Sequence, residues 1–76
     1  MFYEKLYDRA VELHNAGAAK KETTEKLDQM RKELIEEDRS LLSDAGYSEK
    51  SVNGEIEKFS ERLENYCGET VNELYS

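Results

Sequence analysis

The residues of this 76-residue sequence that could carry chemistry are one histidine, one cysteine and many carboxylates. His14 lies on a helical ridge with Tyr3 and Tyr7 and has no evident partner, so we expect it at a boundary or interface and not as a catalytic base. Cys67 lies on an apolar stripe with nothing nearby to lower its pKa, which is typical of a small buried hydrophobic residue. One cysteine and one histidine cannot form a zinc site, and the acidic runs lack the alternating ligands and central glycine of a calcium loop. We therefore expect no catalytic residue, no bound metal, no cofactor and no enzymatic activity.

The carboxylates dominate the charge of the chain. Eighteen acidic residues against eleven basic ones give a net charge of −7. Residues 1–21 carry +1, whereas 22–46 and 47–76 carry −4 each. Such a chain is repelled by phosphate backbones and anionic lipid and is attracted to basic protein surfaces. Carboxylates spaced along rigid helices can imitate the phosphates of a nucleic acid, although the same charge is also typical of a surface that only provides solubility.

Length and composition also limit where the chain can act. The apolar runs are only two or three residues long, and the charged start at residues 1–5 is not followed by an apolar signal stretch. A single cysteine cannot form an intrachain disulfide. We expect one domain spanning 1–76 in the cytoplasm, or in the host cytoplasm if the chain is encoded by a phage or another mobile element, where small acidic chains are common.

Hydrophobic periodicity indicates helices throughout, since there is no proline and no alternating strand pattern. The first helix is expected over about 2–16, and its wide apolar face includes Phe2 and Leu6. Gly17 is expected to end it in a left-handed cap, and Thr23 or Thr24 to cap the next helix.

The second helix is expected over 24–45, with Leu27, Met30, Leu34 and Leu41 on one stripe and Glu37 in the place between the last two where an apolar residue would belong. Asp38 falls inside this stripe, where an unpaired carboxylate is costly to bury. We therefore favour a break between Glu37 and Ser40. The alternative is a continuous helix in which Arg31 pairs with Asp38.

The third helix is expected from Ser48, its cap, to residue 67. Its apolar positions follow in steps of four and three: Val52, Ile56, Phe59, Leu63 and Tyr66. It either ends at Gly68 or continues to about residue 75. The fold class is thus all-α, a small three-helix bundle or an antiparallel helical hairpin with an extra N-terminal helix, and the wide face of the first helix leaves room for a homodimer.

One segment carries a family resemblance. Residues 41–60 have apolar residues before Gly46, then Ser48, Val52 and Ile56 at the spacing of a turn between two packed helices. This segment resembles the helix-turn-helix superfamily. The resemblance implies a recognition helix over 48–60 in which Ser51 and Asn53 read base edges. The many glutamates of that helix argue against DNA binding, which draws its affinity from cations.

The interpretation we favour is a small, acidic, non-enzymatic protein interaction module, a regulator or inhibitor that docks on a basic surface of a larger protein. If that surface is one that binds nucleic acid, the protein would act as a DNA mimic. The residues expected to bind the partner are six carboxylates as a charged face and two tyrosines as anchors: Glu36, Glu37, Asp38, Glu57, Glu61, Glu64, Tyr3 and Tyr7. The alternatives are a helix-turn-helix DNA-binding regulator and a structural homo-oligomer built on the 52–66 seam.

Overall fold

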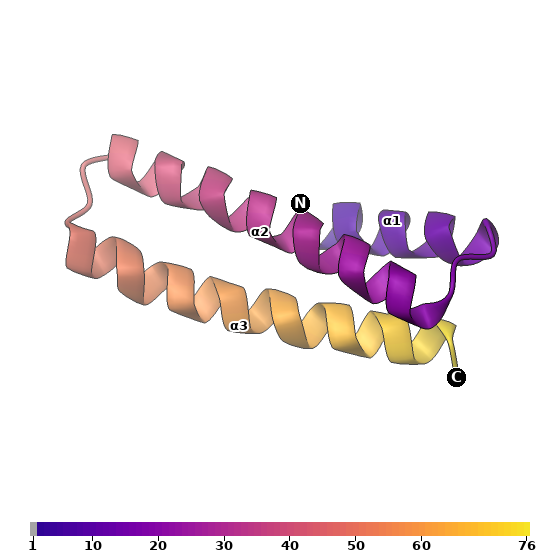
Figure 1. Cartoon of the computed structure of the whole chain (residues 1–76). Helices are drawn as coiled ribbons and strands as arrows, with labels where there is room; N and C mark the ends of the chain where they lie inside the picture. Colours follow the sequence, from indigo (N-terminus) through magenta and orange to yellow (C-terminus); the bar gives the residue numbers. More distant parts are fainter. Residues whose placement is uncertain (1) are drawn as a thin grey trace.

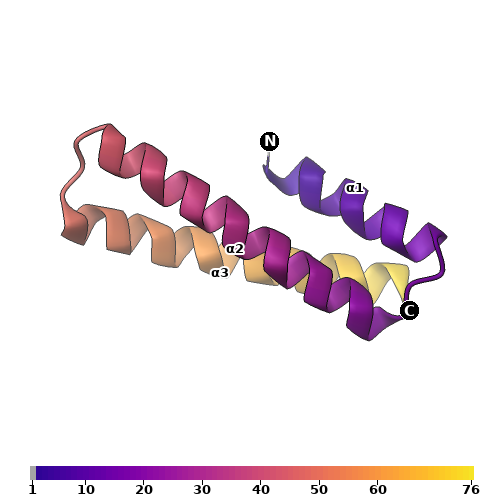
Figure 2. The same cartoon turned by 45° about the horizontal axis from the view of Figure 1, so that its top comes forward.

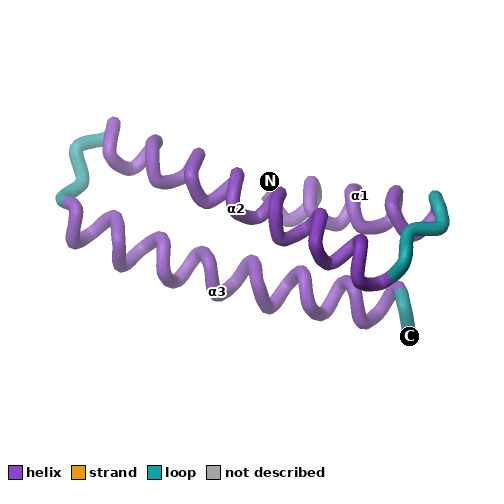
Figure 3. Tube along the Cα trace, viewed as in Figure 1, coloured by secondary structure: helices purple, strands orange, loops and turns teal. Residues whose placement is uncertain are grey.

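The chain folds into three α-helices, and the computed structural model describes residues 2–76, with only the backbone described for Phe2. The helices are α1 (Phe2–Asn15), α2 (Lys20–Asp44) and α3 (Glu49–Leu74), and residues 2–76 contain no strand (Figure 3). The predicted all-α class is confirmed. The expected place of the Phe2 side chain in the first apolar stripe lies outside the described residues.

The long helices α2 and α3 form an antiparallel hairpin, and α1 packs against one half of it. In both views α1 lies along the start of α2 and the end of α3, and its own first residue is near the middle of the hairpin (Figures 1 and 2). The result is a rod of 43 × 18 × 16 Å. The half of the hairpin next to the 45–48 turn is therefore two helices thick, without a third helix over it.

Two glycines end the first two helices in left-handed conformations. Gly17 has a φ of 87° and Gly46 a φ of 90°. Each is followed by the paired backbone hydrogen bonds of a Schellman cap: Ala18 N to Leu13 O and Gly17 N to His14 O, then Tyr47 N to Leu42 O and Gly46 N to Ser43 O. The predicted cap at Gly17 is confirmed.

The helix starts differ from each other. Ser48 caps α3 as predicted, since its Oγ accepts a hydrogen bond from the Ser51 N–H at 3.3 Å. The cap predicted at Thr23 or Thr24 is wrong, because α2 already begins at Lys20 after Ala19, which offers no side-chain cap. Thr24 instead bonds back to the Lys20 carbonyl within the helix.

The break favoured near Asp38 is also wrong, because α2 is continuous from Lys20 to Asp44. The axes of α2 and α3 separate toward the turn that joins them (Figure 1). Asp38 is therefore only half-buried, and its carboxylate keeps access to water. The alternative polar layer is not formed either: Arg31 contacts Asp28 at 3.1 Å and Glu64 at 3.7 Å.

The third helix continues through Gly68 to Leu74, the longer of the two predicted alternatives. Most of its expected seam faces the hairpin partner, since Val52, Ile56 and Leu63 are buried and Phe59 and Tyr66 partly so. The core lies where all three helices meet. Its buried members are Leu6, Ala10, Leu27, Leu34, Leu63, Cys67 and Val71.

Replacing glycine by alanine is expected to change stability in opposite directions at Gly46 and Gly54. Gly46→Ala places a side chain at a φ of 90°, so we expect it to destabilise the protein by about 1 kcal/mol. Gly54→Ala lies inside α3, where a Cβ meets nothing within 4 Å, and is expected to stabilise by about 0.5–1 kcal/mol. Urea denaturation followed by circular dichroism checks both. Equal effects of the two substitutions would contradict the turn geometry.

Candidate functional site

The six carboxylates predicted as one charged face lie on different sides of the molecule. Glu36, Glu37 and Asp38 are consecutive in α2, so they point about 100° apart from one another. The other three, Glu57, Glu61 and Glu64, lie on one flank of α3 and line a shared groove. The structure thus brings the α3 carboxylates together but does not bring the α2 run onto the same flank.

The two predicted tyrosine anchors also differ in environment. The rings of Tyr3 and Tyr66 meet edge to face with centroids 4.9 Å apart, and Tyr3 is half-buried against the core. Tyr7 is 44% exposed on α1. Of these two tyrosines, Tyr7 therefore offers the exposed aromatic surface, whereas Tyr3 helps to hold α1 on α3.

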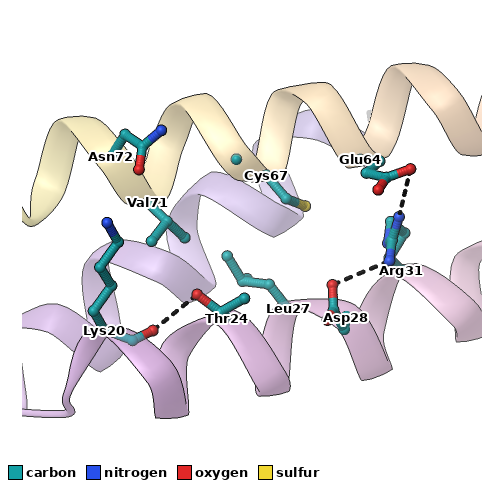
Figure 4. A pocket seen from close by; sticks show the side chains of 10 residues that line it. Lys20, Thr24, Leu27, Asp28, Arg31, Glu64, Cys67, Val71 and Asn72 are labelled. Atoms are coloured by element: carbon teal, nitrogen blue, oxygen red, sulfur yellow. Dashed lines mark hydrogen bonds and ion pairs between the residues drawn. The ribbon is translucent and has the colours of Figure 1, made fainter.

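A groove follows the hairpin between α2 and α3. Its first part is a pocket of about 350 Å³ with an apolar floor that includes Leu27, Cys67 and Val71 (Figure 4). The second part continues toward the turn over Ile35 and Ile56. Among the described residues, only α2 and α3 contribute to the lining of the two parts.

Helical phase places this groove on the side of the hairpin away from α1. Glu64 and Tyr66 are two residues apart and so point about 200° apart around α3. Tyr66 contacts α1 through Tyr3, while Glu64 lines the groove. The hairpin therefore has two flanks, one that carries α1 over half its length and one that carries the groove.

The α1 flank remains open in the half of the hairpin near the turn. A surface depression between α1 and α2 is lined by Met30 and Glu33, and their row continues at helical steps through Glu37, Leu41 and Asp44. Leu41, predicted to lie in the seam, is 58% exposed, because no third helix covers it and α2 and α3 separate there.

This half of the hairpin, residues 36–57, combines charge with exposed apolar surface. It contains seven acidic and two basic residues, so it carries −5 of the total −7. Among the described side chains, three large hydrophobic ones are exposed, and two of them, Leu41 at 58% and Tyr47 at 56%, also lie here. We call residues 36–57 the hairpin tip.

Polar groups at the centre of the groove are partly buried. The Arg31 guanidinium bonds to Asp28 and approaches Glu64 (Figure 4), while its Nε is buried and has no hydrogen-bond partner in the part of the chain that the structure describes. Burial raises the pKa of the Cys67 thiol above its usual value, an effect that nearby Arg31 opposes. A thiol held neutral in this way is a poor nucleophile, which agrees with its expected packing role.

One cluster that the sequence did not single out joins the C-terminus to the first loop. The Tyr75 hydroxyl donates to the Ala18 carbonyl at 2.7 Å and lies 2.7 Å from Thr23 Oγ1. The Tyr75 ring also meets His14 edge to face at 4.8 Å. His14 is thus part of a structural contact, and Thr23, predicted as a cap, is fully buried beneath Tyr75.

The two residues predicted to read DNA bases are engaged within the chain. Asn53 Oδ1 accepts a hydrogen bond from Arg39 at 2.9 Å, and Ser51 Oγ lies 3.1 Å from Ser48 Oγ. Helix-turn-helix units cross their two helices at about 90–120°. Here residues 41–60 join two helices that run side by side (Figures 1 and 2), so this geometry adds no support to the DNA-binding prediction.

Within residues 2–76, no group of three or more His, Cys, Asp or Glu side chains is placed to hold a metal ion. No described helix has the length and apolar character needed to span a membrane. No protein-family model, curated protein or solved structure matches this chain.

Proposed function

We propose that this protein is a small non-enzymatic interaction module, a regulator or inhibitor that docks on a basic surface of a partner protein through its hairpin tip. The observation that carries this proposal is the coincidence, in residues 36–57, of a charge of −5 with the exposed side chains of Leu41 and Tyr47. Charge steers a basic partner to the site, and apolar anchors supply affinity once water is displaced.

The arrangement of the tip supports this role in a second way. Glu37, Leu41 and Asp44 lie on one flank of α2, and Glu55 of α3 precedes the half-buried Phe59 by one helical turn. Carboxylates therefore border the apolar side chains of Leu41 and Phe59. These residues lie on the same flank as α1, beyond the part of the hairpin that α1 covers. A basic, partly apolar element of a partner fits such a surface, because its cations meet carboxylates while its apolar side chains meet Leu41.

The test is charge reversal at the tip. We expect Glu37→Lys with Asp44→Lys and Glu55→Lys to abolish capture of a partner from nuclease-treated lysate, whereas the wild-type protein captures one that is released as salt rises. A synthetic helical Lys/Leu peptide provides a defined basic probe, and its affinity for the triple variant is expected to fall at least about tenfold, given the cost of like-charge contacts.

The matched control reverses three exposed carboxylates elsewhere: Asp8→Lys, Glu25→Lys and Glu69→Lys. It changes the net charge by the same amount and is expected to retain most of the binding. If both triple variants lose binding equally, the interaction depends on net charge and not on the tip. If neither loses it, the electrostatic proposal is wrong.

A further inference from the structure

The groove on the other flank of the hairpin is a second surface, separate from the open α1 flank of the tip. Apolar side chains lie along its floor, with Leu27 and Val71 in the first part and Ile35 and Ile56 in the second, and polar groups separate the two parts. The opposite flank is the one that α1 covers. The α3 side of the groove includes two small residues, Ser60 and Gly68, and a Cβ added at Gly68 would meet nothing within 4 Å. Another helical surface can therefore approach α3 closely at these two positions.

The two walls of the groove carry opposite charge. The α2 wall has three basic residues and one acidic residue, namely Lys20, Arg31, Arg39 and Asp28. The α3 wall has three acidic residues and no basic one among the described residues that line it, namely Glu57, Glu61 and Glu64. A partner that is simply basic would match the α3 wall but oppose the α2 wall. The matching surface has a basic wall and an acidic wall of its own.

A second copy of this chain has such a surface. A two-fold rotation about an axis parallel to the helices places the α2 wall of each copy on the α3 wall of the other. Levels match as well, because Arg39 lies beside Asn53 and Arg31 beside Glu64 across the groove of one chain. Arg39 of each copy then lies level with Asn53 of the other, one helical turn from Glu57. A two-fold axis perpendicular to the helices would instead place acidic walls together.

One long face of the molecule is large enough for a stable interface. One long face of 43 × 18 Å has a footprint of about 770 Å², close to the roughly 800 Å² that each partner buries in a stable interface.

We infer that the protein is a two-fold symmetric homodimer in which the α2/α3 grooves of two copies face each other, with the α2 wall of one on the α3 wall of the other. The inference is independent of the proposed function, because the open flank of the tip carrying Glu37, Leu41 and Asp44 stays on the outside of the dimer.

Two experiments test this dimer: the mass of the protein in solution, and the reversal of charge on each wall of the groove. Sedimentation equilibrium of the wild-type protein is expected to give twice the mass of 8.8 kDa. The acidic-wall variant, Glu57→Lys with Glu61→Lys, and the basic-wall variant, Arg39→Glu, are each expected to give the monomer mass. An equimolar mixture of the two variants is expected to recover the dimer, because both wall contacts again pair opposite charges.

The matched controls are Glu22→Lys with Glu73→Lys, and Lys5→Glu, which change the same charges at exposed positions outside the groove and are expected to stay dimeric. Circular dichroism shows that each variant keeps its helices. A monomeric wild-type protein overturns the inference. So does a mixture that stays monomeric, or an acidic-wall variant that dimerises like the wild type, since the latter indicates a dimer through another face. Loss of partner capture with the dimer intact affects only the proposed function.

Discussion

Leu63→Ala is expected to leave much of the protein unfolded at 25 °C. Leu63 is fully buried at the centre of α3, where it packs in the cluster that contains Leu6 and Leu27 from the other two helices. Truncation of such a leucine costs about 2–5 kcal/mol, because transfer energy is lost and a cavity remains. A core of this size supplies a net stability of only about 3–5 kcal/mol. Urea denaturation followed by circular dichroism at 222 nm measures the loss.

The same chemical change at Leu41 is the control. Leu41 is 58% exposed on the hairpin tip, so Leu41→Ala is expected to change the free energy of unfolding by less than about 0.5 kcal/mol. The contrast tests the placement of α1, because the sequence alone assigns both leucines to apolar stripes. Similar losses at the two positions would mean that Leu41 is covered.

The sequence predicted well those features of the fold that depend on residues close together in the chain, namely helix periodicity and helix caps. The four- and three-residue steps from Val52 to Tyr66 indicated α3, and Gly17 indicated the end of α1, since a left-handed residue there depends on its own backbone. The Ser48 cap followed from the same kind of local chemistry. These features do not depend on what packs against the helix.

The predictions that failed depend on tertiary arrangement. Asp38 was expected to break α2 because a carboxylate inside an apolar stripe should be buried. The stripe is only half-buried at that level, because α2 and α3 separate toward the turn. Leu41 is exposed as well, because α1 does not extend over this half of the hairpin. Helical periodicity gives the direction of a side chain, but it does not tell how far away the neighbouring helix lies.

The candidate surfaces were predictable only in part for the same reason. Net charge and its concentration after residue 21 could be read directly from the sequence. The sequence could not show that Glu57 lies on the groove wall while Glu37 lies on the open flank. This division depends on which side of the hairpin α1 covers. The Tyr75 contact was missed because it joins residues more than fifty positions apart.

Tyr75→Phe is expected to cost about 1–3 kcal/mol, although it removes a single oxygen atom. The Tyr75 hydroxyl has one hydrogen, which it donates to the Ala18 carbonyl, so Thr23 Oγ1 must donate to the Tyr75 oxygen. Phenylalanine keeps the ring contact with His14 but leaves the fully buried Thr23 hydroxyl without this partner. A buried donor left unsatisfied carries its full desolvation cost. Thermal and urea denaturation measure the change.

Two further variants separate this effect from the loss of any tyrosine hydroxyl. Tyr47→Phe removes a hydroxyl from a side chain that is 56% exposed, and it is expected to change stability by less than about 0.5 kcal/mol. Adding Thr23→Val to Tyr75→Phe removes the orphaned hydroxyl, so the double variant is expected to recover part of the loss. If the loss of stability in the double variant equals the sum of the losses in Tyr75→Phe alone and Thr23→Val alone, the two hydroxyls are not coupled. The C-terminal turn would then be held only by the packing of the Tyr75 ring, because the relay from Thr23 to Ala18 would contribute nothing.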